Sequence, residues 1–273
     1  MAHSASSCAE SAPARRDVTS APSDVVAISV GAVMIPPDQI SGILTPIGSP
    51  RQPKTIYEPL LPPPTPRTDI AYRLLTSTEL DSAADLIAEV FSRDEPLAVA
   101  TGQTRSELAA LLRGMGPSAI AENRTSAAWA GDRLAGVALA TRFTWAPPDG
   151  AEALSPNYRP IGAMLAELEA DFEARPQKDL ETTMHIHMLA VDRRYRRLGI
   201  ADALIRASLA HAVEQGFRRV VTDATNPASQ RVFSNAGFST RNEVRYDAFE
   251  FEGRRVFAGI PDAESTLFMS KEL

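Results

Sequence analysis

The chain has 273 residues, of which 44% are hydrophobic, so it can bury one substantial core or two small ones. Its formal net charge of -6 argues against nucleic-acid binding through bulk positive charge. The single cysteine, Cys8, excludes an intrachain disulfide and a cysteine metal cluster, and fits a reducing compartment.

Residues 1–68 differ in composition from the rest of the chain. They hold 12 of the 21 prolines, and proline removes backbone donors and fixes φ. We therefore expect a disordered or loosely docked extension before a domain at residues 69–273. The apolar stretch at residues 25–35 is much shorter than the roughly 20 residues that span a bilayer. We expect a cytoplasmic protein with no membrane partner.

From residue 70 the apolar periodicity predicts regular structure. Thr76 or Ser77 can cap the first helix, and Gly114 and Gly116 predict the end of the second. The Gly131–Asp132 pair predicts a tight turn between two strands. The expected order is a strand at 70–75, a helix through about 90, a helix at 106–113, strands at 126–130 and 134–143, a loop at 145–160 and a helix at 161–174.

The second half predicts an alternation of strands and helices. The expected order is a strand at 183–191, a helix at 201–215, a strand at 219–223, a helix at 226–235 and two strands within 238–273 around Gly253. The helix at 201–215 is predicted to turn Leu204, Ile205, Leu209 and Val213 inward.

The loop Arg-Arg-Leu-Gly-Ile-Ala at residues 196–201 follows a predicted strand directly and opens a predicted helix. A helix N-terminus aims several backbone N–H groups at one point, which suits a pyrophosphate. Gly199 lets the backbone approach the phosphate without a Cβ, and Ala201 keeps the first turn open. Arg193 and Arg194 add positive charge. The alternative interpretation is a strand-to-helix turn with a basic rim.

This strand, loop and helix resemble the GNAT acetyltransferase superfamily, and the segment at 226–238 is similar to the helix and Gly-Phe that close such folds. The resemblance covers residues 70–273. It implies an α/β (α+β) fold, with a mixed central sheet, splayed strands 4 and 5 and flanking helices, and acetyl-CoA as cosubstrate. The cosubstrate contacts that it implies are Leu189, Ala190, Val191, Arg196, Arg197, Leu198, Gly199, Ile200, Ala201, Asn226, Ser229 and Phe233.

Three further segments are similar to arylalkylamine N-acetyltransferases. Phe-Ser-Arg-Asp-Glu-Pro-Leu at 91–97 resembles the insect-type enzymes, whose glutamate, here Glu95, is a general base. His-Ile-His-Met-Leu-Ala-Val at 185–191 resembles the vertebrate strand, whose two histidines relay the amine proton. Residues 245–253 are similar to closing strands of insect-type relatives. The resemblance implies a small primary amine, favouring an arylalkylamine, as substrate.

The chemistry requires a proton acceptor, because an alkylamine with a pKa near the ~10.4 of lysine arrives protonated. A desolvated Glu95 has a raised pKa suited to that task, directly or through water. His185 and His187 are two residues apart, so they share one face of a strand and can carry the proton outward. The alternatives are a surface acid at a turn and structural histidines. No third ligand is evident, so we expect no metal.

The sequence departs from the common GNAT pattern at Phe233, where many members have a tyrosine that acts as general acid. Ser229 and Thr225 are the candidate hydroxyls in the comparable stretch, although capping of the following helix explains them at least as well. A thiol of pKa ~8.5 is also a fair leaving group without help.

Other functions remain open at this point. The acceptor could be a polyamine, an aminoglycoside-like compound or a protein lysine. The chain could also bind acyl-CoA without turnover, although a pure binder needs no general base. We expect a monomer or weak dimer.

Overall fold

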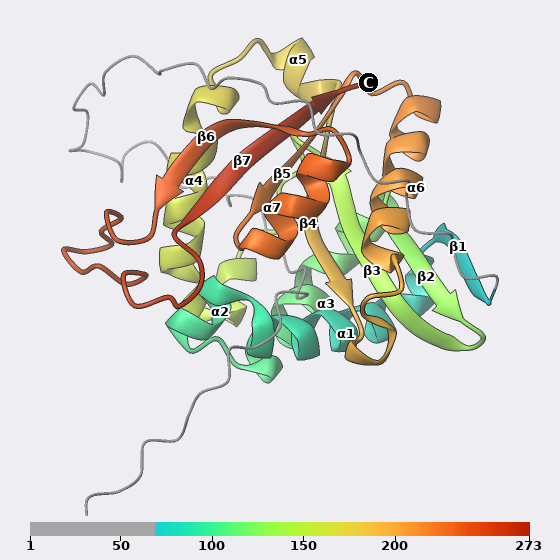
Figure 1. Cartoon of the computed structure of the whole chain (residues 1–273), viewed down its shortest axis with the longest axis horizontal. Helices are drawn as coiled ribbons and strands as arrows, with labels where there is room; N and C mark the ends of the chain where they lie inside the picture. The colour runs from blue at the N-terminus through green and yellow to red at the C-terminus, as the bar shows by residue number, and fades with distance from the viewer. Residues whose placement is uncertain (1–68) are drawn as a thin grey trace, which may run out of the picture.

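A computed structural model describes residues 69–273, apart from the side chains of residues 151 and 152. The expectations for residues 1–68, including Cys8, lie outside this part of the chain. The described residues form one mixed sheet with helices on both of its faces (Figure 1). No helix in residues 69–273 combines the length and apolar character needed to cross a bilayer.

The central sheet has seven strands in the order β1-β2-β3-β4-β5-β7-β6. Only β4 and β5 are parallel, whereas every other neighbouring pair is antiparallel. The last strand of the chain, β7, lies between β5 and β6. The strands are β1 (Ile70–Leu74), β2 (Ser126–Ala130), β3 (Arg133–Arg142), β4 (Thr183–Val191), β5 (Arg219–Ala224), β6 (Ser239–Arg245) and β7 (Ser265–Glu272).

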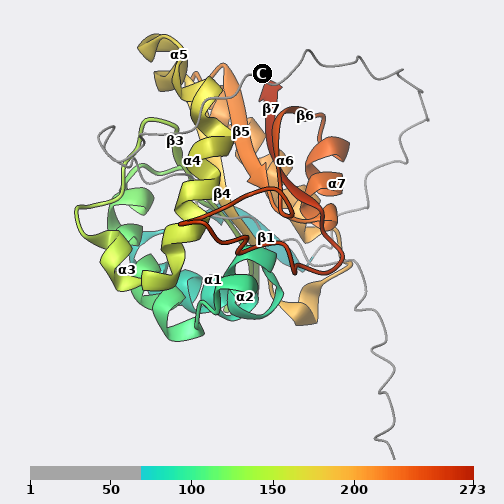
Figure 2. The same ribbon diagram turned by 90° about the vertical axis from the view of Figure 1, so that its left-hand side faces the viewer.

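Helices cover the sheet in two layers, each with its own apolar core (Figure 2). The larger core packs α1, α3 and α4 on one face, and the smaller packs α6 and α7 on the other. The helices are α1 (Leu80–Asp94), α2 (Pro96–Thr101), α3 (Arg105–Ala121), α4 (Arg159–Glu173), α5 (Gln177–Glu181), α6 (Ile200–Glu214) and α7 (Pro227–Asn235). The predicted mixed sheet with flanking helices is confirmed.

Strands β4 and β5 separate partway along their length. Their pairing ends at Ile186 and Thr222, although β4 continues along β3 to Val191 and β5 continues along β7 to Ala224. The backbone of β4 beyond Ile186 therefore has no strand partner on its β5 side. This is the predicted splay of strands 4 and 5.

A β-bulge interrupts β4 at the same level. Leu139 pairs with Met188, and the next residue, Ala140, pairs with Ile186, so His187 is an extra residue on β4. A bulge re-aims side chains and is frequent beside active sites. Here it allows His187 to lie against His185 while Met188 still packs into the larger core.

The prediction that α3 ends before Gly114 is wrong, because the helix continues to Ala121. It begins with a capping box between Thr104 and Glu107 and contains Pro117. Gly116 serves close packing instead of termination, since a Cβ there would lie 2.3 Å from Leu80 Cδ1.

The inward face of α6 also differs from the prediction at one position. Leu204 and Ile205 are buried, but Val213 is 58% exposed. The small residues Ser208 and Ala212 are buried against the sheet instead. The short helices α2 and α5 were not predicted, and the loop at 145–160 contains 3-10 turns before α4 begins at Arg159.

Candidate active site

The turn between β4 and α6 has the backbone that the sequence predicts. Gly199 is the N-cap of α6 and has a left-handed φ of 74°, and Arg197 has a φ of 60°. Such angles favour glycine. As at every helix start, the first N–H groups of α6 have no partner within the helix. A cleft of about 180 Å³ opens at this helix end. It is lined by Val191, Tyr195, Arg196, Arg197, Gly199, Ile200, Ala201, Asp202, Ala228, Arg231 and Val232.

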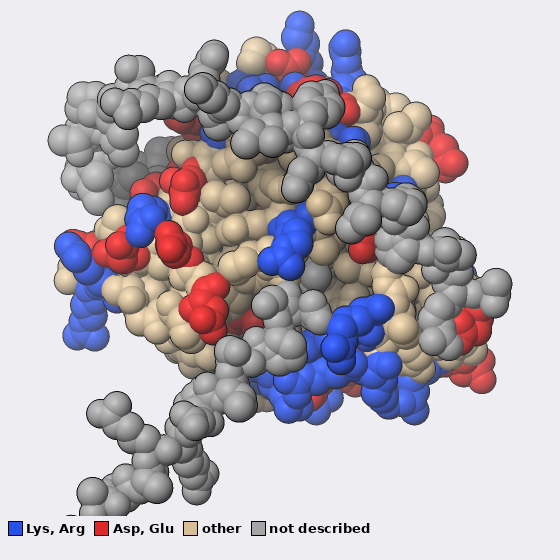
Figure 3. Space-filling model, in the orientation of Figure 1, with Lys and Arg blue, Asp and Glu red and all other residues tan. Residues whose placement is uncertain are grey.

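Basic side chains gather around this turn (Figure 3). Most of their charge is already paired. Arg196 lies 2.5 Å and Arg193 3.3 Å from the carboxylate of Asp94, and Arg194 pairs with Asp192. Asp94 ends α1, directly before Glu95. The ion pair therefore ties the turn to the element that carries the predicted base.

The other predicted cosubstrate residues differ in their surroundings. Val191, Ile200 and Ala201 line the cleft. Leu189, Ala190 and Phe233 are fully buried, and Phe233 packs edge-on against Phe238 with ring centroids 5.0 Å apart. Leu198 packs partly buried against the smaller core. Their cosubstrate roles stay predictions.

Helix α7 supplies the far wall of the cleft through residues that sequence reasoning missed. Ala228, Arg231 and Val232 line it, at the i, i+3, i+4 spacing of one helix face. That spacing was a visible signal, since the residues occur on the helix that follows β5.

Glu95 lies at the corner between α1 and α2 and is only 1% exposed. It is the N-cap of α2, with Pro96 in the first helical turn, and its Oε2 accepts a hydrogen bond of 2.6 Å from the Ala98 amide. Burial raises the pKa of Glu95 to about 7, although the Ala98 amide, the Thr225 hydroxyl and the Leu97 amide oppose the rise. Capping alone does not require a carboxyl with so high a pKa.

His185 and His187 are both buried, and their ring centroids are 4.1 Å apart. The Nε2 atom of His187 lies 2.6 Å from the Thr141 hydroxyl. Burial, and then the charge of neighbouring His185, hold the pKa of His187 well below its usual range. Phe143 stacks on His185 and Trp145 lies beside His187, with centroids 5.6 and 5.7 Å apart.

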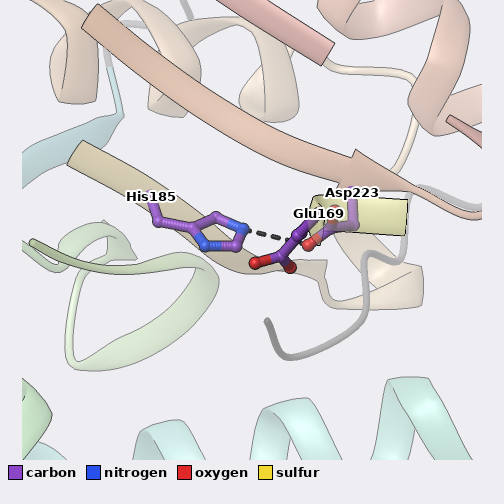
Figure 4. Close-up of side chains that lie close together, drawn as sticks. All are labelled: Glu169, His185 and Asp223. Atoms are coloured by element: carbon purple, nitrogen blue, oxygen red, sulfur yellow. Dashed lines mark hydrogen bonds and ion pairs between the residues drawn. The ribbon is translucent and has the colours of Figure 1, made fainter. Parts of the chain in front are cut away.

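Two buried carboxylates lie beside the histidine pair, and sequence reasoning missed both. Asp223 Oδ2 is 3.0 Å from His185 Nε2, and Glu169 on α4 faces the same point (Figure 4). One donor atom from each of Glu169, His185 and Asp223 lies within 4.8 Å of the others, so two carboxylates that the sequence did not reveal lie beside His185. A histidine with two carboxylates can bind a divalent cation, yet here Nε2 is engaged directly by Asp223.

Tyr158 lies close enough to this cluster and to Glu95 for the charges of both to affect it. It is buried, and burial raises its pKa, with further contributions from the charges of Glu169, Asp223 and Glu95. Tyr246 is also buried, and its hydroxyl donates a hydrogen bond of 2.5 Å to the Thr225 carbonyl. Several buried polar side chains therefore lie within the larger core on this side of the sheet.

The candidate hydroxyls near α7 have local structural roles. Asn226 is the N-cap of α7, and Ser229 completes a capping box with it. The Ser229 hydroxyl donates to the Asn226 carbonyl at 2.9 Å and accepts from the Asn226 amide at 3.2 Å. Thr225 is buried beside Glu95. This arrangement favours the capping interpretation of Ser229 over a role as general acid.

Comparison with solved structures gives related folds over three quarters of the chain. Arylalkylamine N-acetyltransferase 2 from Aedes aegypti is 28% identical, with a TM-score of 0.64, over 75% of this chain and 99% of that one. The C-terminal condensation domain of Ebony, in complex with beta-alanyl-dopamine, is 17% identical with a TM-score of 0.68 over 75% and 99%. Drosophila melanogaster polyamine N-acetyltransferase is 17% identical with a TM-score of 0.57 over 75% and 100%.

Sequence comparison gives a family but no individual relative. No protein of curated function matches the chain significantly. The sequence profile of the Acetyltransferase (GNAT) family matches residues 87–238, which include the α1–α2 corner, the β4–α6 turn and the whole of α7. The protein is therefore a member of the GNAT family of N-acetyltransferases, as its sequence predicts.

Proposed function

We propose that this protein transfers an acetyl group from acetyl-CoA to a small primary amine, with an arylalkylamine as the favoured acceptor. The observation that carries the proposal is Glu95, a buried carboxyl with a pKa of about 7. It follows Asp94, which is joined by ion pairs to the turn at the N-terminus of α6. Asp94 thus links the proposed proton acceptor to the proposed phosphate-binding turn.

The residues of the β4–α6 turn suit the diphosphate of acetyl-CoA. The left-handed Gly199 brings the backbone to the cleft without a side chain, and the α6 N-terminus offers N–H groups and a favourable dipole. Arg197 and Arg231 line the same cleft. When bound, acetyl-CoA supplies the acetyl group as a thioester. The unpaired β5 side of β4, from Leu189 to Val191, would lie along the pantetheine arm.

Glu95 accepts the proton of the incoming ammonium group in this proposal. Because its pKa is about 7, the carboxyl is largely ionised at slightly basic pH and is still basic enough to take a proton directly or through one water. Burial supplies this basicity, because desolvation disfavours the charged form. The amine nitrogen then has a lone pair for attack on the carbonyl carbon.

The remaining steps use the backbone and the thiol itself. A β4 N–H near Leu189, beyond the point where β5 leaves, is the donor that would stabilise negative charge on the carbonyl oxygen. The leaving thiol has an ordinary pKa of ~8.5 and needs no strong acid. This is consistent with Phe233 in the core and with Ser229 in a capping box.

Aromatic side chains support the preference for an arylalkylamine. Phe143 and Trp145 lie against the histidine pair, and Tyr158 is buried near the acidic side chains, so aromatic residues surround the proposed site. The mosquito arylalkylamine enzyme is the 28% identical structure, whereas the polyamine enzyme at 17% identity shares only the fold.

The test is a CoA-release assay on the full chain with acetyl-CoA and a panel of amines. The panel contains phenethylamine- and indolethylamine-type compounds, linear diamines, an aminoglycoside and a lysine peptide. We expect the arylalkylamines to give the highest kcat/KM. Higher kcat/KM for a diamine, aminoglycoside or lysine would overturn the favoured acceptor. Acetyl-CoA binding by calorimetry without turnover on any amine would favour the non-catalytic alternative.

A further inference from the structure

The buried group at the β4–β5 splay contains a carboxylate that the reaction described above does not use. Asp223 is fully buried, and its Oδ2 lies 3.0 Å from His185 Nε2. Its other oxygen, Oδ1, has no hydrogen-bond partner among residues 69–273. A half-satisfied buried carboxylate is costly, so its presence calls for a compensating role.

The geometry points to Asp223 as a positioning residue that makes His185 the store for the proton removed from the substrate amine. This inference rests on the proposed acetyl transfer. Asp223 can only accept a hydrogen bond when ionised, so His185 must present Nε2–H to it. The lone pair of the neutral ring is then fixed on Nδ1. A proton that arrives there makes an imidazolium held by the Asp223 carboxylate.

The groups that surround His185 differ from those that surround His187. The ionisable groups that face His185 are His187 on its own strand, Glu169 and Glu173 on α4, and Asp223 on β5. All except His187 are acids. His187 contacts Thr141 and has a lowered pKa, so it remains neutral beside a charged His185.

The proton transfer balances without any further reactant. The N–H bond of the ammonium group breaks, its electron pair stays on the substrate nitrogen, and an N–H bond forms at His185 Nδ1. Glu95 is the first acceptor, and its own O–H bond breaks as the proton moves on to His185. The charges of Glu169, Asp223 and Glu95 all contribute to the raised pKa of Tyr158, so this side chain lies near both groups. His185 then releases the proton to solvent or to the departing thiolate.

The first experiment measures the tautomer of His185 by ¹⁵N NMR on the wild-type full chain, with the other three histidines assigned by substitution. We expect the neutral ring to carry its proton on Nε2. A ring protonated on Nδ1 would overturn the inference whatever the activity of the protein. Metal in stoichiometric amount that is retained by the wild type and lost in Asp223→Asn would overturn it as well, because the cation would replace the proton.

The second experiment uses the substrate to separate a proton-handling role from a structural one. Asp223→Asn keeps the shape of the side chain but removes the charge. We expect kcat/KM to fall about 10²-fold with phenethylamine at pH 7. With β,β-difluorophenethylamine, whose ammonium group is much more acidic, the loss should shrink to about threefold or less, because less help with deprotonation is needed.

Two variants serve as comparisons in the same assays. Glu169→Gln should give the same pattern with a smaller loss, because the hydrogen bond to His185 Nε2 comes from Asp223. Ser208→Ala removes one partner of the buried Ser208–Ser126 hydrogen bond. Any change in kcat/KM that it causes should be the same for the two amines. An equal loss of kcat/KM with both amines in Asp223→Asn would show a structural role. Failure of the proposed function would instead appear as no turnover of any amine by the wild type.

Discussion

The two ends of the site differ in how they are built: one depends on backbone conformation and the other on buried side chains. At the β4–α6 turn, the backbone conformation of one continuous segment shapes most of the cleft, and α7 supplies its far wall. The arginines around the turn are largely paired with Asp94 and Asp192. Near the β4–β5 splay, polar side chains from β3, β4, β5, α4 and the α1–α2 corner lie in the core, and Glu95, Glu169, His185 and Asp223 are all buried. One end is local in sequence and open, and the other is assembled by the fold and closed.

This difference separates the part of the site expected to bind the cosubstrate from the part expected to transfer protons. A backbone cradle discriminates little beyond the phosphate groups, and it holds a cosubstrate without a change of protonation. Buried acids and histidines lower the stability of the fold, and they are useful only in a step that moves a proton or a charge. We therefore expect variants at the splay and the α1–α2 corner to change turnover, and variants at the turn to change acetyl-CoA affinity.

The largest effect is expected for Glu95→Gln. Removal of a positioned general base typically costs 10²- to 10⁴-fold in rate, so kcat/KM for the amine should fall by about that factor. The wild-type kcat/KM should decline as pH falls through about 7, because protonation of Glu95 removes the base, and this limb should be absent in the variant. Steady-state kinetics from pH 5.5 to 9 measure both.

Glu107→Gln is the matched control for that variant. Glu107 also uses its carboxylate at a helix start, where it accepts a hydrogen bond from the Thr104 amide, but it lies on α3 and its pKa is lowered. The Glu107→Gln variant should therefore have the turnover of the wild type. Calorimetry should give both variants wild-type acetyl-CoA affinity. A Glu95→Gln enzyme with wild-type kcat/KM would contradict the assignment of Glu95 as base.

Glu95→Gln should increase the stability of the protein at basic pH, although it should lower turnover. The pKa of Glu95 rises from 4.5 to about 7 on folding, so the protonated carboxyl favours the folded state and its contribution is lost as pH rises from 4.5 through 7. The shift corresponds to roughly 3 kcal/mol, at 1.36 kcal/mol per pKa unit. Glu95→Gln should therefore raise the free energy of unfolding at pH 8 by up to that amount and change it little at pH 4.5.

Urea unfolding of wild type and variant across this pH range checks the prediction. Parallel curves for the two proteins would show that Glu95 titrates normally in the folded state. That result would also weaken the comparison between a closed, costly end of the site and an open one.

A smaller effect, on affinity instead of rate, is expected for Gly199→Ala. The left-handed backbone at φ 74° costs a non-glycine residue about 1–2 kcal/mol, and the added methyl group would enter the approach to the diphosphate. We expect acetyl-CoA affinity to fall about tenfold, a loss of ~1.4 kcal/mol. At saturating acetyl-CoA, kcat should stay within a factor of about three.

Gly216→Ala is the control at the other end of α6. Gly216 has a φ of 78° and no atom within 4 Å of an added Cβ, so it bears the same backbone strain without facing the cleft. Both variants should lose similar stability, and only Gly199→Ala should lose affinity for acetyl-CoA in calorimetry. Equal acetyl-CoA affinity for the two variants would show that Gly199 does not contribute to the binding of the diphosphate.

The contrast between the two ends also explains how far the sequence predicts the molecule. The turn at Gly199 was predictable because strand, glycine and helix follow one another within a few residues. Glu95 and the histidine pair were found through resemblance to known families. Asp223 and Glu169 were missed because their partners are 38 and 16 residues from them in sequence, and only the fold brings them to His185.

A visible signal did exist for both missed residues. Glu169 occurs on the buried face of α4 with Leu165, Leu168 and Phe172, and Asp223 is a charged residue within the short β5 strand, between Thr222 and Ala224. A charge at a core position is expected to be paired. The bulge at His187 and the full length of α3 had no such signal, because both depend on the packing of neighbouring elements.

The smallest effect is expected for Ser229→Ala, and it tests whether the helix that follows β5 belongs to the reaction. The Ser229 hydroxyl is fully used in the α7 capping box with Asn226, so its removal should lower the free energy of unfolding by about 1 kcal/mol. Turnover should change less than about threefold, because a thiolate of ordinary pKa leaves without an acid. Urea unfolding and CoA-release kinetics measure the two quantities on the same protein. A rate loss of 10²-fold or more without loss of stability would show that the hydroxyl is a general acid, and the open end of the site would then contribute to chemistry as well as to binding.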